Sequence, residues 1–197
     1  MLKYPIGIQS FEQIREDGYV YVDKTDLVYR LLTTGKIYFL SRPRRFGKSL
    51  LVSTLKNYFL GRKELFRGLA IESMEKEWAE YPVFHIDFNG SNFTEPGALD
   101  RKIEAMVFGW EDQYGSTGRY TGIGDRFVEV LRCAHERTGR RCVVLVDEYD
   151  KPLPMIYQSG YLTIKDYDRS TTSFLLDFPN NEVKSGFVSL AASGFSK

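Results

Sequence analysis

The fold of this 197-residue chain is decided by the stretch Ser41-Arg42-Pro43-Arg44-Arg45-Phe46-Gly47-Lys48-Ser49. An apolar run of strand length, residues 37–40, precedes it, and residues 48–55 follow with the apolar spacing of a helix. A segment with the order strand, loop, helix can form a phosphate-binding site, in which the backbone of the loop and the N-terminus of the helix both contact the phosphate groups. Gly47 allows close backbone approach to a phosphate, while Lys48 and Ser49 supply a cation and a hydroxyl for magnesium.

The stretch matches the phosphate-loop pattern GxxxxGK[ST] only in part, because Arg42 stands where the pattern has its first glycine. Arginine fits that position if its backbone angles are ordinary, whereas Gly47 lies where backbone and phosphate approach most closely. The positive charge of Arg42, Arg44 and Arg45 suits a triphosphate and equally suits a nucleic-acid backbone. Taken alone, residues 47–49 also fit a chance match at a helix start, with the arginines in a solvated loop.

A second motif follows an apolar run, residues 142–146, which reads as a strand buried on both faces of a parallel sheet. The run ends in Asp147 and Glu148, so it delivers two carboxylates to the edge where open α/β sheets bind ligands. In a phosphate-loop enzyme Asp147 would hold the magnesium shell and Glu148 would orient or activate the attacking water. An ordinary polar pair ending a strand is the alternative, but the basic loop in the same chain favours one joint nucleotide site.

Composition limits the other functions. The 27 Lys and Arg residues nearly balance 26 Asp and Glu, so the net charge of +1 creates no global attraction to nucleic acid or membrane. The two cysteines and two histidines do not have the clustered spacing of a structural zinc site, which needs four such ligands. No apolar run approaches the length that crosses a bilayer, and we therefore expect a cytoplasmic protein without a membrane partner.

Strands alternate with helices along the first 155 residues, which predicts an α/β fold. The expected architecture is a P-loop NTPase-like three-layer sandwich with a mostly parallel sheet. Strands are expected at 19–22, 37–40, 83–88 and 142–146, and helices from the Asp23–Asp26 region to Gly35, at 48–55, 99–114 and 127–137.

The prolines at 152 and 154 place a boundary near residue 155. Residues 161–164 and 173–176 flank a polar stretch at 166–170 and predict a β-hairpin, and a short helix is expected from 179 to 187. The predicted domains are residues 1–155, the P-loop region, and residues 156–197, the hairpin with its helix.

Four segments together resemble the bacterial AAA-ATPase-like family: YPIGIQSF at 4–11, YVDKT at 21–25, FLSRPRRFGKS at 39–49 and VDEYDKPL at 146–153. Proteins of this family usually join such a region to a C-terminal PD-(D/E)XK nuclease-like domain. The resemblance implies ATP and Mg²⁺ as cofactors, a variant Walker A loop, and a Walker B pair in which Asp147, with Ser49, binds the metal and Glu148 is catalytic. The nucleotide-binding residues that it implies are Arg42, Arg44, Arg45, Phe46, Gly47, Lys48 and Ser49.

The resemblance to the family is nearly continuous to about residue 153. After that residue, the chain resembles a later part of the family's sequence. Residues 157–167 resemble a segment that normally lies well downstream, before the nuclease-like part. An internal deletion is implied, which removes the sensor strand between the two motif strands and the helical lid. We therefore expect an incomplete sheet and poor or absent hydrolysis, since misplacement by about 1 Å can cost on the order of a hundredfold in rate.

Two functions follow from these observations. The first is an ATP-binding, AAA-ATPase-like protein that binds ATP with magnesium but hydrolyses it poorly or not at all. The alternative is a phosphate-recognising, nucleic-acid-binding module without nucleotide turnover. A nucleic-acid or protein partner is expected through the missing nuclease-like portion.

Overall fold

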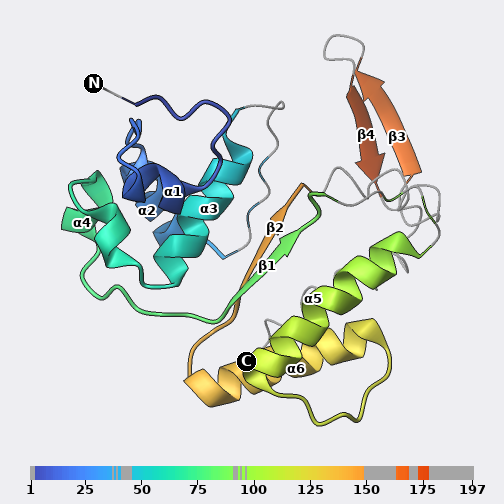
Figure 1. Ribbon diagram of the computed structural model, residues 1–197. Helices are drawn as coiled ribbons and strands as arrows, with labels where there is room; N and C mark the ends of the chain where they lie inside the picture. The colour runs from blue at the N-terminus through green and yellow to red at the C-terminus, as the bar shows by residue number, and fades with distance from the viewer. Residues whose placement is uncertain are drawn as a thin grey trace. The chain divides into compact units, whose positions relative to one another are not determined.

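The structure is a computed structural model that describes residues 3–36, 38, 40, 46–90, 93, 95 and 97–148, together with the backbone of 163–168 and 173–177. The described chain mixes helices and strands (Figure 1). It forms two compact units, Met1–His85 with Arg140–Asp147, and Ile86–Gly139 with Glu148–Lys197.

The first unit is built from short helices around an aromatic core. Its helices are α1 (Phe11–Glu16), α2 (Thr25–Thr34), α3 (Lys48–Phe59), the 3₁₀ helix η1 (Lys63–Phe66) and α4 (Ala70–Met74). The Phe11 ring lies 4.8 Å from the Phe66 ring and 5.2 Å from the Tyr21 ring, centroid to centroid. The buried cluster consists of Phe11, Leu65, Phe66, Leu69 and Ile71.

Helix α1 begins at a capping signal. The Ser10 hydroxyl accepts a hydrogen bond from the Gln13 amide at 3.2 Å, which satisfies a donor that has no partner inside the helix. The Phe11 amide donates to the Ser53 hydroxyl of α3 at 2.9 Å, and α1 packs against α3. The N-terminal segment is therefore tied to the helix that starts at Lys48.

Asp23 and Thr25 join the starts of α2 and α4. The Asp23 carboxylate accepts from the Thr25 amide at 2.8 Å, the Thr25 hydroxyl at 2.7 Å and the Ala70 amide at 2.7 Å. The buried Thr25 hydroxyl in turn accepts from the Ile71 amide at 3.1 Å. Burial raises the pKa of Asp23, but the hydrogen bonds from Thr25 and Ala70 outweigh burial and hold that pKa below its usual value.

Strands β1 (Val83–Asp87) and β2 (Val143–Asp147) pair in a two-stranded parallel sheet. Next to this pairing, the Val143 amide donates to the Pro82 carbonyl at 2.9 Å. Both strands were predicted, within one residue at each end. The prediction that the second is buried on both faces is wrong, because Val146 is 43% exposed and, in the described part of the chain, β2 has β1 as its one sheet neighbour.

Two other predicted strands differ from the structure. Tyr19 forms one isolated parallel bridge to Lys3, and residues 20–22 are irregular, since Tyr21 packs its ring on Phe11 instead of joining a sheet. Of the predicted strand 37–40, residues 38 and 40 are not in a strand, and 37 and 39 lie outside the described residues. Tyr38 donates its hydroxyl to the Leu31 carbonyl, which holds it on the end of α2.

The second unit contains α5 (Ala98–Tyr114) and α6 (Ile123–Thr138), which pack against each other. Both helices were predicted, although α6 begins four residues earlier than expected. Arg126 makes a two-point contact with Glu111, Nε to Oε1 at 2.9 Å and Nη2 to Oε2 at 2.6 Å, and bonds Glu104 at 3.2 Å. The residues of the pair that are fully buried are Val107, Val130 and Ala134.

The connection between α5 and α6 is held by one buried carboxylate. Glu129 accepts hydrogen bonds from the Thr117 hydroxyl, the Ser116 hydroxyl at 2.9 Å and the Thr117 amide at 3.3 Å. The hydrogen bond from Thr117 is the main reason that the pKa of Glu129 lies below its usual value, and burial opposes it. The start of the connection, at Ser116 and Thr117, is thereby held against α6.

Strands β3 (Thr163–Asp168) and β4 (Ser173–Asp177) pair in an antiparallel arrangement, with Ile164 opposite Leu176 and an irregularity before Asp166. Residues 166–168, which were expected in the turn, belong to β3. The expected helix at 179–187 and the boundary near 155 lie outside the described residues, so both stay predictions.

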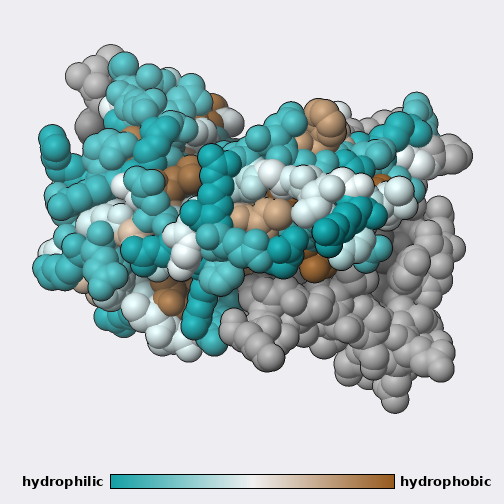
Figure 2. Space-filling view, turned by 90° about the horizontal axis from the view of Figure 1, so that it is seen from below, coloured by the Kyte–Doolittle hydropathy of each residue, from teal (hydrophilic) through white to brown (hydrophobic). Residues whose placement is uncertain are grey.

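Apolar side chains are scattered over the described surface. On the face drawn in Figure 2 they occur as small groups between hydrophilic residues. The most exposed are Ile6 at 92% and Val22 at 73%. Isolated apolar residues of this kind are normal on a protein surface and indicate no particular partner.

The Asp23 junction predicts a stability change. We expect Asp23→Ala to lower the free energy of unfolding by about 1–2 kcal/mol, because it removes the acceptor that caps two helices. Since the pKa of Asp23 is lowered in the folded protein, its contribution is complete above the unfolded value near 3.9 and is lost as the pH falls through the folded value.

Urea unfolding at pH 7 and pH 3 measures this, with the exposed Asp112→Ala as control. The wild type and Asp23→Ala should differ at pH 7, and the difference should be smaller at pH 3, where the carboxylate begins to take up a proton. An equal difference at both pH values would contradict the assignment of the carboxylate as the stabilising group.

Candidate functional site

The site begins at the N-terminus of α3. Gly47 is the N-cap residue and has left-handed backbone angles, φ 74° and ψ 23°. Glycine adopts these angles without penalty, whereas a side chain at this position would be strained although its Cβ would meet no atom within 4 Å. The first turn of α3 carries no acidic side chain, so the positive end of the helix dipole is suited to an anion.

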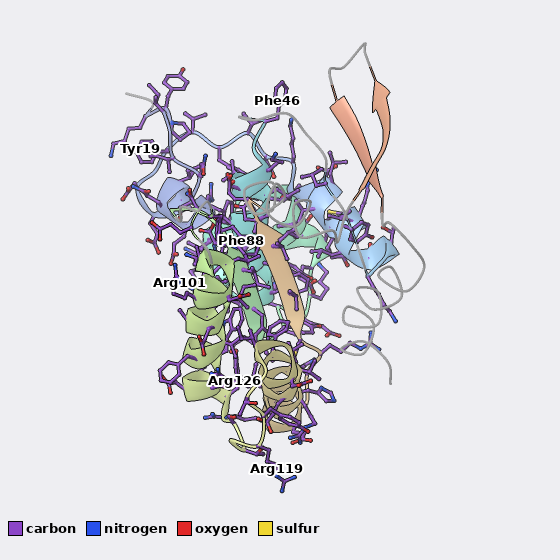
Figure 3. The ribbon with its side chains drawn as sticks, turned by 90° about the vertical axis from the view of Figure 1, so that its right-hand side faces the viewer. Tyr19, Phe46, Phe88, Arg101, Arg119 and Arg126 are labelled. Carbon is purple, nitrogen blue, oxygen red and sulfur yellow. The ribbon has the colours of Figure 1, made fainter. Side chains whose placement is uncertain are left out.

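Helix α3 packs against β2 within the first unit. In Figures 1 and 3, the start of α3 and the carboxyl end of β2 lie toward the same end of that unit, and Phe46, which Figure 3 labels, lies just before the start of α3. Lys48 and Ser49 occupy the first turn of α3, and Asp147 is the last residue of β2. A helix N-terminus and a strand end that come from distant parts of the sequence thus lie toward the same end of the first unit.

Asp147 is buried at 9% exposure, and Glu148 directly after it is half-buried. Glu148 has a left-handed backbone, φ 55°, which is uncommon for a residue with a side chain. The chain passes from the first unit to the second between these two residues.

The donor set suits magnesium more than a transition metal. Within the described ranges no group of three or more His, Cys, Asp or Glu side chains is placed to hold a metal ion. Mg²⁺ does not need such a cage, because it binds through one or two carboxylates, retained waters and phosphate oxygens of the substrate. The Asp147 carboxylate and the Ser49 hydroxyl are oxygen donors of the required kind.

The predicted site residues fall into three groups. Gly47, Lys48, Ser49 and Asp147 lie in the first unit, on packed elements. Phe46 lies just before them and is 64% exposed, and Glu148 opens the following segment of the second unit. The arginines at 42, 44 and 45 lie outside the described residues, and their predicted role stays a prediction.

Two features near the candidate site could not be predicted from the sequence. Ser53 anchors α3 to α1 through its hydroxyl, yet a serine within a helix pattern reads as an ordinary polar position. The left-handed backbone of Glu148 was also missed, since glutamate does not favour that conformation.

These features define a mixed helix-and-strand protein with a candidate phosphate and metal site at a helix start and a strand end. The chain belongs to the AAA-ATPase-like family, because the family model described as "Predicted AAA-ATPase" matches residues 5–188. The resemblance seen in the sequence is confirmed by this match. The nuclease-like domain and the internal deletion stay predictions.

A relative from Azotobacter chroococcum mcd 1, described as "Uncharacterized protein in vnfD 5'region", is 45% identical over 152 residues. The match covers 77% of this chain and 30% of the relative, so the chain spans about a third of the length of that protein. No solved structure matches the chain. None of the helices in the described residues is long and apolar enough to span a membrane.

The left-handed Gly47 predicts opposite effects of alanine at two glycines. We expect Gly47→Ala to lower the free energy of unfolding by about 1–2 kcal/mol, because an L-residue is disfavoured in that conformation. Gly109→Ala, inside α5 with open space around its Cβ, should raise it by about 0.5–1 kcal/mol. Urea unfolding of both variants measures the two changes, and a change of the same sign in both would refute the role of the Gly47 backbone.

Proposed function

We propose that this protein binds ATP together with Mg²⁺ at the start of α3 and the end of β2, and that it hydrolyses the nucleotide poorly or not at all. The observation that carries the proposal is that the helix beginning at Gly47-Lys48-Ser49 packs, in one compact unit, against the strand ending at Asp147. Membership of a family described as "Predicted AAA-ATPase" supports the same function.

Each residue has a defined task in this proposal. The amides of the first turn of α3 and the Lys48 ammonium bind the β and γ phosphates. The Ser49 hydroxyl and the Asp147 carboxylate hold the metal, which shields the phosphate charge when bound. Glu148 orients a water molecule toward the γ phosphate.

The proposal of weak hydrolysis rests on the order of segments in the sequence. In the family a further strand carries a polar sensor residue between the two motif strands, and residues 157–167 of this chain resemble a segment that normally lies well downstream of it. Without a sensor, the γ phosphate has one fewer group to position it for attack. ATP binding needs fewer precisely placed groups than ATP hydrolysis does. The protein therefore keeps the ability to bind ATP when the groups that position it for hydrolysis are missing.

Titration calorimetry with ATP and Mg²⁺ tests the proposal. We expect Lys48→Ala to weaken binding at least tenfold, because a hydrogen bond to a charged group contributes about 1.5–3 kcal/mol. Lys56→Ala is the matched control, since Lys56 lies on the same helix about 12 Å further along and should leave the affinity unchanged. Equal affinities of wild type and Lys48→Ala would refute the proposal.

Titration with a nucleic acid tests the alternative function. Steeply salt-dependent binding of a DNA or RNA oligonucleotide that ATP does not displace would favour a phosphate-recognising module. Release of inorganic phosphate at a rate that Glu148→Gln abolishes would instead show that turnover is intact.

A further inference from the structure

Four exposed residues form a stripe along the outer side of helix α5. Their spacing of four, three and four residues places them on one side of a helix. They are Arg101, Ala105, Phe108 and Asp112. Phe108 is 59% exposed, whereas its neighbour Val107 is fully buried on the other side of the helix. An exposed phenylalanine alone indicates no partner, and the pattern of the residues around it is what distinguishes this face.

Gly109 is a second unusual feature of the outer side of α5. Glycine inside a helix lowers the stability of that helix relative to alanine. In the described part of the chain, a Cβ at this position would meet no atom within 4 Å, so packing inside the unit does not require glycine. A missing side chain lets another backbone approach closely. Gly109 therefore fits a partner that lies against this side of the helix.

The stripe is complementary to itself. Along α5 its order is cation, small side chain, large side chain, anion. When a second copy of α5 packs antiparallel, with the two-fold axis between residues 105 and 108, Arg101 faces Asp112 of the copy. In the same arrangement Ala105 faces Phe108 of the copy, and the two-fold axis makes each contact twice. A parallel pairing would instead place each charge opposite the same charge, which is unfavourable.

The residues beside the stripe are compatible with the antiparallel pairing. Glu104, which accepts a hydrogen bond from Arg126 at 3.2 Å, would face Gly109 of the copy, so no like charges oppose each other there. Arg101 forms an ion pair with Glu95 at 3.6 Å, but the two side chains are 62% and 69% exposed. An exposed ion pair of this kind is weak, so it does not prevent Arg101 from binding a second carboxylate.

We propose that the outer side of α5 forms a weak, antiparallel, two-fold dimer with a second copy of the chain. The stripe from residue 101 to residue 112 spans about 16 Å of helix, which is short for a protein interface. The dissociation constant therefore lies in the range of about 10–500 µM, as for a transient complex. The contact uses residues of the second unit and is independent of the proposed nucleotide binding.

Sedimentation equilibrium of the 197-residue chain from about 5 µM to about 1 mM tests the proposal, with monomer expected at the low end and dimer at the high end. Arg101→Asp places two acids opposite each other twice in the dimer, so it should raise the dissociation constant at least about tenfold. Asp112→Arg should do the same. The double variant, with both substitutions, restores opposite charges and should return the constant to within about threefold of the wild type.

Arg119→Asp is the matched control, because it makes the same change of charge on the connection between α5 and α6, outside the stripe (Figure 3). It should leave the dissociation constant within about twofold of the wild type. A control that weakens association as much as Arg101→Asp, or a double variant that does not restore it, would overturn the proposal. A wild type that stays monomeric at the highest concentration would also overturn it.

Phe108→Ser gives a second test that does not depend on charge. Because Phe108 is exposed, the variant should keep the melting temperature of the wild type within about 2 °C, measured at the low concentration. We expect it to lose association over the whole concentration range. Association equal to that of the wild type would show that the chain dimerises through another surface, and would overturn the proposal.

Discussion

The packing of helix α3 against strand β2 is the contact on which the candidate site depends. The first turn, with Lys48 and Ser49, and the strand end, with Asp147, therefore lie toward the same end of the first unit. Helix α1 also packs against α3, where the Phe11 amide donates to Ser53 and the Phe11 ring enters the buried cluster. The helix N-terminus is thus fixed by packing and hydrogen bonds, and the acid is fixed by its place in a paired strand. This packing supports the proposed site, because binding of a metal-bound phosphate requires groups that are held in position.

The sequence predicted those parts of the fold that have a strong internal pattern. Helix α5, with its apolar spacing, and strands β1 and β2, with their compact apolar runs, were found close to their observed ends. Helices α1 and α4 were missed because each is short and is defined by distant partners, as when Asp23 caps the amide of Ala70. The strand expected at 19–22 is wrong, since its aromatic pattern reflects packing of Tyr21 on Phe11 and not pairing in a sheet.

The site was predictable where chemistry fixes residue type, and unpredictable where tertiary structure fixes conformation. Lys48, Ser49 and Asp147 follow from a motif at a helix start and an acid at a strand end, and the structure places both elements in one unit. Their binding roles stay proposals. The backbone of Glu148 left no trace in the sequence, because a left-handed glutamate is imposed by its surroundings and opposed by its own side chain. The family match at residues 5–188 supports the ATPase-like character, while the longer relative carries no functional description.

The central claim is that Lys48 and Asp147 act on the same metal-bound nucleotide. A double-mutant cycle on ATP affinity with Lys48→Ala, Asp147→Asn and the double variant measures it most directly, in Mg²⁺ and again in EDTA. We expect a coupling of about 0.5–3 kcal/mol in Mg²⁺ that disappears in EDTA, because the two side chains are linked through the metal and the phosphates. Additive losses within about 0.5 kcal/mol in Mg²⁺ would show that Lys48 and Asp147 do not share a ligand.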